Sequence, residues 1–207
     1  GMVYEALMVL LRARVALAPQ LARAGHIKSF TQLLSATQRN ALHPGSSNEH
    51  SCCRLLEVLR VVAADRECAE AMVPAGLLRI IVNDLARTPR CAATLAISVD
   101  LVRQCAAHHA PRVGFGLVEY GAVEALLNLL SDSASVAQQV PGGAGARVHA
   151  IETLKALEDD SEAGPEVAAR LVGSTVWEHC KGQRHDLFLA TGGSGALMLM
   201  GPQRSTL

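Results

Sequence analysis

The chain has 207 residues, of which half are apolar, 18% are charged and only 3% are aromatic. This apolar share excludes an intrinsically disordered chain, and its bias toward Ala, Leu and Val favours close-packed helices over a β-sandwich. The formal net charge is zero, so the chain lacks the basic excess of a nucleic-acid binder and has no polybasic run for anionic lipid.

The chain begins Gly1-Met2 and enters an amphipathic helical pattern almost at once. It shows no basic n-region or cleavage site, so we predict no signal peptide. No apolar run approaches the ~20 residues that a transmembrane helix needs. A glycine before the methionine and a start inside a helical pattern are typical of a segment cut from a longer protein.

One pattern recurs along the chain: an apolar residue, three residues, a glycine, one residue, an aliphatic residue and a Leu-rich run. It occurs at 21–27, 72–78 and 117–123, and in degenerate form at 171–177, where Thr175 replaces the glycine. Successive copies are 51, 45 and 54 residues apart. These steps are at or slightly above the ~40–47 residues of armadillo and HEAT repeats.

Each copy predicts a helical repeat. The glycine can adopt positive φ and end a short first helix, and a second helix begins at the aliphatic residue. Apolar positions at helical spacing follow, and then a long third helix, predicted over 51–64, 93–107 and 147–158. A single unit cannot bury its apolar faces, so neighbours must stack. We therefore predict an all-α, armadillo/HEAT-like right-handed superhelical solenoid of about four repeats.

The solenoid is expected over residues 1–189, with two interruptions. Residues 37–50 and 131–146 combine Pro, Gly, Ser and Asn, and are predicted to be mobile loops. Residues 190–207 form a Gly-rich tail, expected to be poorly ordered unless it docks.

The three full third helices carry charge in a common register. Each has an acid followed three residues later by a base, which places both on one face of a helix. The pairs are Glu57 and Arg60, Asp100 and Arg103, and Glu152 and Lys155. Third helices line the concave groove of armadillo proteins, so the groove is predicted to carry one acidic and one basic stripe.

Two interpretations of this charge ladder stay open. Charged pairs at this spacing are ordinary solvated helix surface, and each contributes only a few tenths of a kcal/mol. Alternatively, the groove binds a partner segment of mixed charge. Armadillo grooves that bind extended peptides typically present an Asn ladder, whereas Val61, Gln104 and Ala156 hold the equivalent positions here. This difference argues against the usual extended-peptide mode.

Catalytic and metal-binding patterns are weak. The six cysteines form no C-x-x-C pair and are predicted to be reduced and buried, not disulfide-bonded. His179, Cys180 and His185 offer three ligands, but structural zinc normally has four, in pairs. The Gly-rich stretches lack a phosphate-binding signature. We therefore expect no enzyme activity and no cofactor.

The C-terminal end carries a resemblance to a known family. Residues 174–188 read Ser-Thr-Val-Trp-Glu-His-Cys-Lys-Gly-Gln-Arg-His-Asp-Leu-Phe. This stretch resembles the C-terminal end of the receptor-mediated endocytosis protein 8 family, whose pattern reads roughly S-x-V-W-x-x-x-K-x-Q-[KR]-H-D-L-F. The matching residues are Trp177, Lys181, Gln183, His185, Asp186, Leu187 and Phe188. The chain departs at 198–202, where the family tends to carry Tyr-Leu-Thr-Gly-Pro, and it has no His-Pro-Asp signature of a DnaJ domain.

The resemblance implies a cytoplasmic protein peripheral to early endosomes. Members are very large co-chaperones in which a DnaJ domain, outside this chain, recruits a heat-shock-70-class chaperone. Their helical repeats engage sorting nexins and endosomal actin-regulatory machinery. The chain would then be a non-enzymatic scaffold segment in endosomal sorting and recycling.

Three alternatives remain from the residues themselves. One is a generic armadillo adaptor that binds an extended peptide in nuclear transport or cytoskeletal regulation. Another is an enzyme or metal protein on a helical scaffold, which would need converging polar groups in one pocket. The third concerns His185-Asp186 alone: Asp186 either caps a turn while Leu187 and Phe188 pack on the last repeat, or these residues form a docking surface.

Overall fold

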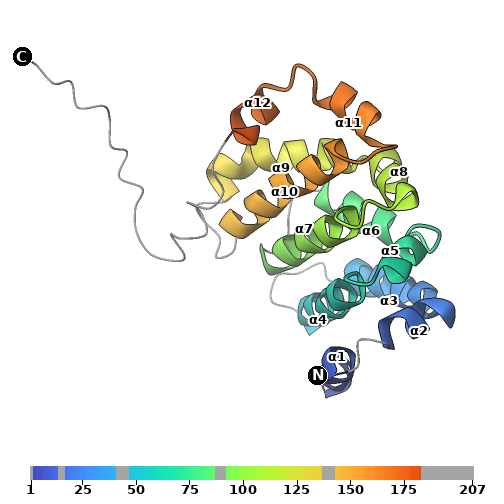
Figure 1. Ribbon diagram of the computed structural model, residues 1–207. Helices are drawn as coiled ribbons and strands as arrows, with labels where there is room; N and C mark the ends of the chain where they lie inside the picture. The colour runs from blue at the N-terminus through green and yellow to red at the C-terminus, as the bar shows by residue number, and fades with distance from the viewer. Residues whose placement is uncertain (1, 14–16, 41–46, 87–91, 137–142, 183–207) are drawn as a thin grey trace, which may run out of the picture.

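The computed structural model describes residues 2–13, 17–40, 47–86, 92–136 and 143–182, and in these ranges the chain is helical without a strand. Twelve helices follow one another (Figure 1). They are α1 (Met2–Ala13), α2 (Leu17–Arg23), α3 (His26–Asn40), α4 (Ser47–Val62), α5 (Arg66–Met72), α6 (Leu77–Leu85), α7 (Ala92–Ala106), α8 (Pro111–Glu119), α9 (Ala122–Val136), α10 (Gly143–Glu158), α11 (Gly164–Leu171) and α12 (Thr175–Lys181). The all-α prediction is confirmed.

The helices form units of three, and helices of equal rank lie side by side in successive units (Figure 1). A short first helix, a second helix of variable length and a long third helix make up each of α2–α4, α5–α7 and α8–α10. The third helices α4, α7 and α10 are in contact in that order, and α1 extends this row beside α4. The second helices α3, α6, α9 and α12 form another row. Each unit therefore buries its apolar faces against its neighbours.

Left-handed glycines separate the first and second helices. Gly25, Gly76 and Gly121 have φ of 74°, 73° and 82°, at the three positions where the repeat pattern predicts them. In the fourth copy the residue with positive φ is Gly173, at 79°, and not Thr175, which the pattern had aligned with the glycines. Positive φ is sterically unfavourable for threonine. The turn therefore forms two residues earlier, at Gly173, and Thr175 begins α12.

The third helices begin earlier than predicted, and the loops before two of them are shorter. Helix α3 continues to Asn40 and α4 begins at Ser47, so most of 37–50 is helical. Polar residues that look like loop in the sequence also favour helix N-termini, and Glu49 suits the positive end of the α4 dipole. Similarly, α9 reaches Val136 and α10 begins at Gly143. The intervening residues 41–46 and 137–142, and the predicted tail 190–207, lie outside the described ranges.

One apolar core runs through the stack, from Leu11 on α1 to Cys180 on α12. Trp177 is 2% exposed in the last helix and closes this core. The Ser174 side chain caps α12 by accepting a hydrogen bond from the Trp177 backbone N–H at 3.2 Å. Gly164 allows α11 to start against the end of α10, since a Cβ there would collide with the Glu158 carbonyl oxygen.

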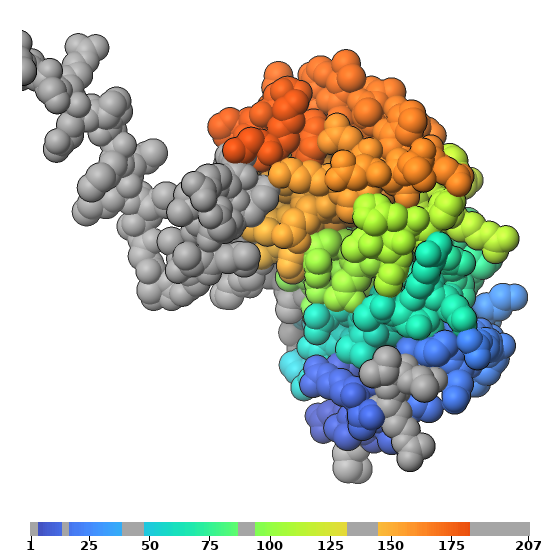
Figure 2. All heavy atoms as spheres, in the orientation of Figure 1, coloured from blue at the N-terminus to red at the C-terminus, as the bar shows by residue number. Residues whose placement is uncertain are grey.

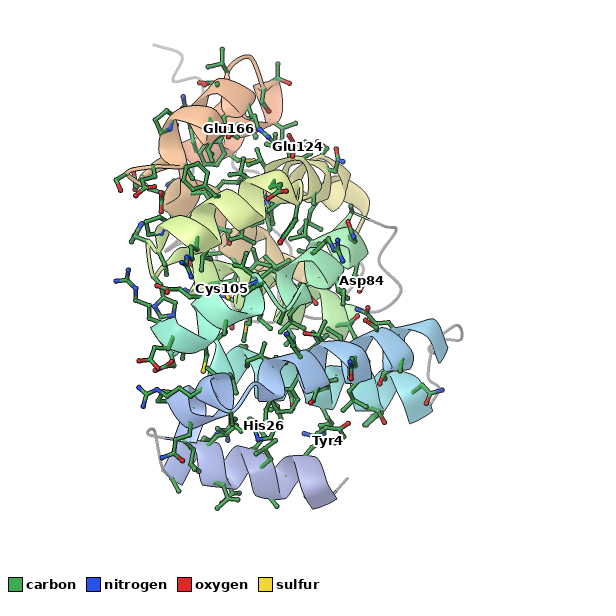
Figure 3. All side chains as sticks on the ribbon, turned by 90° about the vertical axis from the view of Figure 1, so that its right-hand side faces the viewer. Tyr4, His26, Asp84, Cys105, Glu124 and Glu166 are labelled. Carbon is green, nitrogen blue, oxygen red and sulfur yellow. The ribbon has the colours of Figure 1, made fainter. Side chains whose placement is uncertain are left out.

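Each first helix is also bonded to the main chain of the preceding first helix. Side chains on or next to α5, α8 and α11 donate to carbonyl oxygens on or next to α2, α5 and α8, respectively. The bonds run from Cys68 Sγ to Ala18 O (2.9 Å), from Tyr120 Oη to Val73 O (3.4 Å) and from Arg170 Nη1 to Val118 O (3.2 Å). Arg170 also pairs with Glu124 and Glu166, which lie close together in Figure 3.

No single helix in the described ranges is long and apolar enough to cross a membrane. Helix α8 and the start of α9 meet that test only when taken together, across a bend of 62°.

Candidate partner-binding face

The six residues of the charge ladder lie on three helices that stack directly on one another. Glu57 and Arg60 are on α4, Asp100 and Arg103 on α7, and Glu152 and Lys155 on α10. Helix α7 contacts α4 on one side and α10 on the other (Figure 1). The common register therefore brings charges together across the helices as well as along them. We call the surface formed by these six residues, together with Gln104 and His149, the third-helix face.

Asp100 is the centre of this face, and it is buried, with 7% of its surface exposed. One carboxylate oxygen accepts bonds from Arg103 Nη2 at 2.6 Å and Nε at 2.9 Å. The other accepts from Arg60 Nη1 of α4 at 3.2 Å and from Gln104 Nε2 at 3.2 Å. Two guanidinium groups from adjacent units thus share one carboxylate, which joins α4 to α7.

The pairing differs from the acid–base pairs expected within each helix. Asp100 and Arg103 do pair three residues apart. Glu57, however, pairs with Arg54 at 3.2 Å, and Arg60 reaches Asp100 in the next unit. Arg103 also lies 3.7 Å from Glu152 of α10. The charges therefore form a chain across three units.

Burial and neighbouring charges shift the pKa values of the two central groups, Asp100 and His149. Burial alone would raise the pKa of Asp100, but hydrogen bonds from Arg103 and Arg60 and the neighbouring positive charge outweigh it, so this pKa lies below its ordinary value. Burial lowers the pKa of His149 on α10, and attraction to Asp100 opposes this only partly. Near neutral pH, Asp100 is therefore a carboxylate and His149 is uncharged.

Two buried polar atoms on this face have no hydrogen-bond partner among the described residues: Gln104 Oε1 and His149 Nδ1. The His149 nitrogen lies 3.6 Å from Asp100 Oδ1, which is too long for a hydrogen bond. Buried polar atoms are normally satisfied, so these two atoms are exceptions among the described residues. Sequence reasoning had compared Gln104 with the Asn ladder but had missed His149, which stands one helical turn before Glu152.

The groups around Asp100 remain accessible. The side chains of Arg60 and Arg103 are 35% and 31% exposed and that of Glu152 is 42% exposed, against 10% for Asp100. The face thus consists of the buried Asp100 carboxylate, which fixes the positions of the arginines, and a surrounding rim of half-exposed acidic and basic side chains. Such a rim can bind charged groups of a partner without large rearrangement.

Two residues of the C-terminal family motif lie in described positions. Trp177 is part of the core, and Lys181 Nζ pairs with Glu178 at 2.6 Å on the surface of α12. Gln183, His185, Asp186, Leu187 and Phe188 lie outside the described residues, so the structure does not place them.

Other candidate sites give little chemistry. In the described part of the chain, no group of three or more His, Cys, Asp or Glu side chains is placed to hold a metal ion. The five described cysteines are free thiols. A pocket of about 380 Å³ lies between α9, α10 and α12, where Arg147 donates to Cys180 Sγ at 3.3 Å.

Comparison with known proteins found no matching family model, no similar curated protein and no similar solved structure.

Proposed function

We propose that the chain is a non-enzymatic protein-interaction scaffold, and that the third-helix face binds its partner. The observation that carries this proposal is the buried Asp100 network, which fixes half-exposed charges of both signs along three stacked helices. An ordered charged rim needs little further ordering on binding, so less affinity is lost to entropy.

We further propose that the stack is an armadillo-type solenoid. Three observations support this finer assignment: a short first helix and a second helix precede a long third helix in each unit, a left-handed glycine stands between the first two, and helices of equal rank stack. In this arrangement the third-helix face would line the inner surface of the superhelix, where a segment could contact several units at once.

The partner that fits this face is a segment with both acidic and basic side chains. Arg60 and Arg103 would attract carboxylates, while Glu57 and Glu152 would attract basic groups. We propose no cofactor and no nucleic-acid partner, because the charge is balanced and not predominantly basic.

The biological setting that we propose rests on the resemblance at 174–188. In that setting the chain belongs to an endosomal trafficking co-chaperone and acts at early endosomes in receptor-mediated endocytosis, sorting and recycling. Sorting nexins or endosomal actin-regulatory proteins are the proposed partners. A heat-shock-70-class chaperone would be reached only through a DnaJ domain outside this chain.

One observation favours a second candidate, a generic armadillo adaptor for an extended peptide. Gln104 is an amide at the Asn-ladder position of α7, and its oxygen is buried without a partner. Its Nε2 is already bonded to Asp100, and Val61 and Ala156 offer no amide at the equivalent positions. Only one of the three Asn-ladder positions therefore carries an amide side chain.

The test is a pull-down from cytosol with identification of captured proteins, using a variant that alters the rim and preserves the centre. Reversing Arg60 and Arg103 would leave buried Asp100 without its counter-charges and would risk unfolding. We therefore choose Glu57→Lys with Glu152→Lys. The matched control is Glu119→Lys with Glu162→Lys, two exposed positions away from the third helices with the same total charge change.

Capture of sorting nexins or endosomal actin-regulatory proteins by wild type and control, and their loss with the rim variant, would support the proposal. Equal capture by all three proteins would exclude the third-helix face and direct attention to the C-terminal end. Capture of nuclear-transport or cytoskeletal proteins instead would favour the second candidate. Melting curves for each variant show whether the fold is retained.

A further inference from the structure

Helix α1 is apolar on two faces, although it lies at one end of the stack (Figures 1 and 2). Its only charged residues are Glu5 and Arg12. A helix that is apolar on nearly all sides is normally covered on nearly all sides. In the described structure α1 contacts only α4 and α2 extensively, so a large part of it has no cover.

The inner face of α1 packs on the core. Leu11 is 3% exposed, and Tyr4, Leu7 and Met8 pack against buried residues. Figure 3 shows Tyr4 on the side of α1 that faces the rest of the stack. The inner face explains why α1 packs against α4. It does not explain why the opposite face of α1 is also apolar.

The outer face of α1 is a second apolar stripe. Ala6, Val9, Leu10 and Ala13 are all exposed and follow the spacing of residues on one face of a helix. Val9 is 66% exposed and Leu10 is 52% exposed, two of the five large apolar residues that are exposed in the described ranges. They are adjacent in sequence, so they form a patch and not scattered single residues.

The position that corresponds to Leu10 is buried in the third helices. When Leu11 is aligned with Leu59, Val102 and Leu154, which are all buried, Leu10 falls at the position of Val58, Leu101 and Thr153. Each of these three is 0% exposed. The residues at the Leu10 position are therefore fully buried in α4, α7 and α10, whereas Leu10 itself is 52% exposed in α1.

Charge on α1 identifies the occupant. Glu5 and Arg12 are two helical turns apart on the same flank of the outer face, both are exposed, and neither forms an ion pair with a described residue. If α1 met an identical helix in antiparallel orientation, each Glu5 would face Arg12 of the other copy, and Leu10 would lie between Ala6 and Val9 on the outer face of the other copy. In a parallel pair the charged flanks of the two copies would lie on opposite sides of the contact, so neither Glu5 nor Arg12 would meet a charge of the other α1.

We propose that the outer face of α1 binds α1 of a second copy of this chain, in an antiparallel pair related by a two-fold axis. The patch presents the same apolar surface on both copies, and its charges are complementary to those of a second copy, as an isologous interface requires. A twelve-residue helix is about 18 Å long. The contact is therefore smaller than the ~1,200 Å² at the lower limit for stable complexes, and the dimer should be weak and concentration-dependent.

The experiment is sedimentation velocity of the full chain over a hundredfold concentration range. Wild type should shift from monomer to dimer as concentration rises. Leu10→Glu should remain monomeric, whereas Val172→Glu, which alters another exposed apolar residue far from α1, should dimerise like wild type. Circular dichroism shows that each variant is folded.

Charge reversal tests the antiparallel register. Glu5→Arg places arginine against Arg12 of the other copy at both ends of the contact and should weaken the dimer at least tenfold. The double variant Glu5→Arg with Arg12→Glu restores opposite charges and should recover it. A wild-type monomer at every concentration, a dimer that survives Leu10→Glu, or a double variant no better than the single one would each overturn the proposal. None of these results bears on the third-helix face.

Discussion

Replacement of Asp100 by alanine should destabilise the protein more than any other single change among the charged residues of the third-helix face. The substitution removes the carboxylate that accepts four hydrogen bonds from three side chains. Arg60 then loses its counter-charge, Arg103 keeps only Glu152 at 3.7 Å, and Gln104 Nε2 loses its acceptor. The loss combines broken bonds with leftover positive charge.

The size of the effect follows from burial. Breaking a buried ion pair by removing one partner costs about 3–5 kcal/mol. Because the two arginine side chains are 35% and 31% exposed, water screens part of the remaining charge, and we expect about 2–3 kcal/mol near neutral pH. Asp100→Asn should cost less, about 1–2 kcal/mol, since the amide oxygen still accepts a hydrogen bond.

Urea unfolding followed by circular dichroism measures both values, with Glu119→Ala as an exposed control. The pH dependence has a defined sign. The pKa of Asp100 is lower in the folded protein than its ordinary value, so its contribution is complete above that ordinary value and is lost as pH falls through the folded one. The gap between wild type and Asp100→Asn should therefore close in acid. A loss below about 0.5 kcal/mol for Asp100→Ala would refute the reasoning and make the network ordinary solvated surface.

Three further outcomes test other parts of the structure. The pKa of His149 is lowered by burial and partly restored by the neighbouring carboxylate, so in the asparagine variant its imidazole should titrate at a lower pH by NMR; an upward shift would contradict this. Gly164→Ala should cost about 2 kcal/mol or more because its methyl group meets the Glu158 carbonyl, whereas Gly145→Ala, with open space around it, should be neutral or stabilising in the same urea assay. Burial raises the pKa of Cys105 to about 12, so iodoacetamide should modify it only as the protein unfolds; rapid labelling of the native protein would show that this part of the core opens.

The repeat could be predicted from sequence because its turn depends on one residue type. Only glycine adopts positive φ without strain, so the positions of Gly25, Gly76 and Gly121 determined where the short helices end. The fourth copy failed for the same reason: alignment by spacing selected Thr175, while the backbone needed the nearby Gly173. Spacing alone does not identify a turn when the residue that permits it has shifted.

The candidate site was predictable in register but not in pairing. Periodicity placed Arg60 and Asp100 at comparable positions of their helices, yet their contact joins residues that are 40 positions apart. Burial of Asp100 depends on α7 having a neighbour on each side, which the sequence of α7 alone does not contain. His149 escaped notice because a single histidine on a helix carries no signal until an adjacent helix brings a carboxylate near it.

The two rows of helices are joined to different degrees, and this gives the stack a preferred direction of bending. Successive first helices share little packing, and they are joined by single side-chain bonds to main-chain carbonyls and by the exposed Arg23–Glu67 pair. The third helices α4, α7 and α10 pack extensively on one another, and the Asp100 network adds to that packing. Bending of the stack should therefore separate the first helices before it separates α4, α7 and α10.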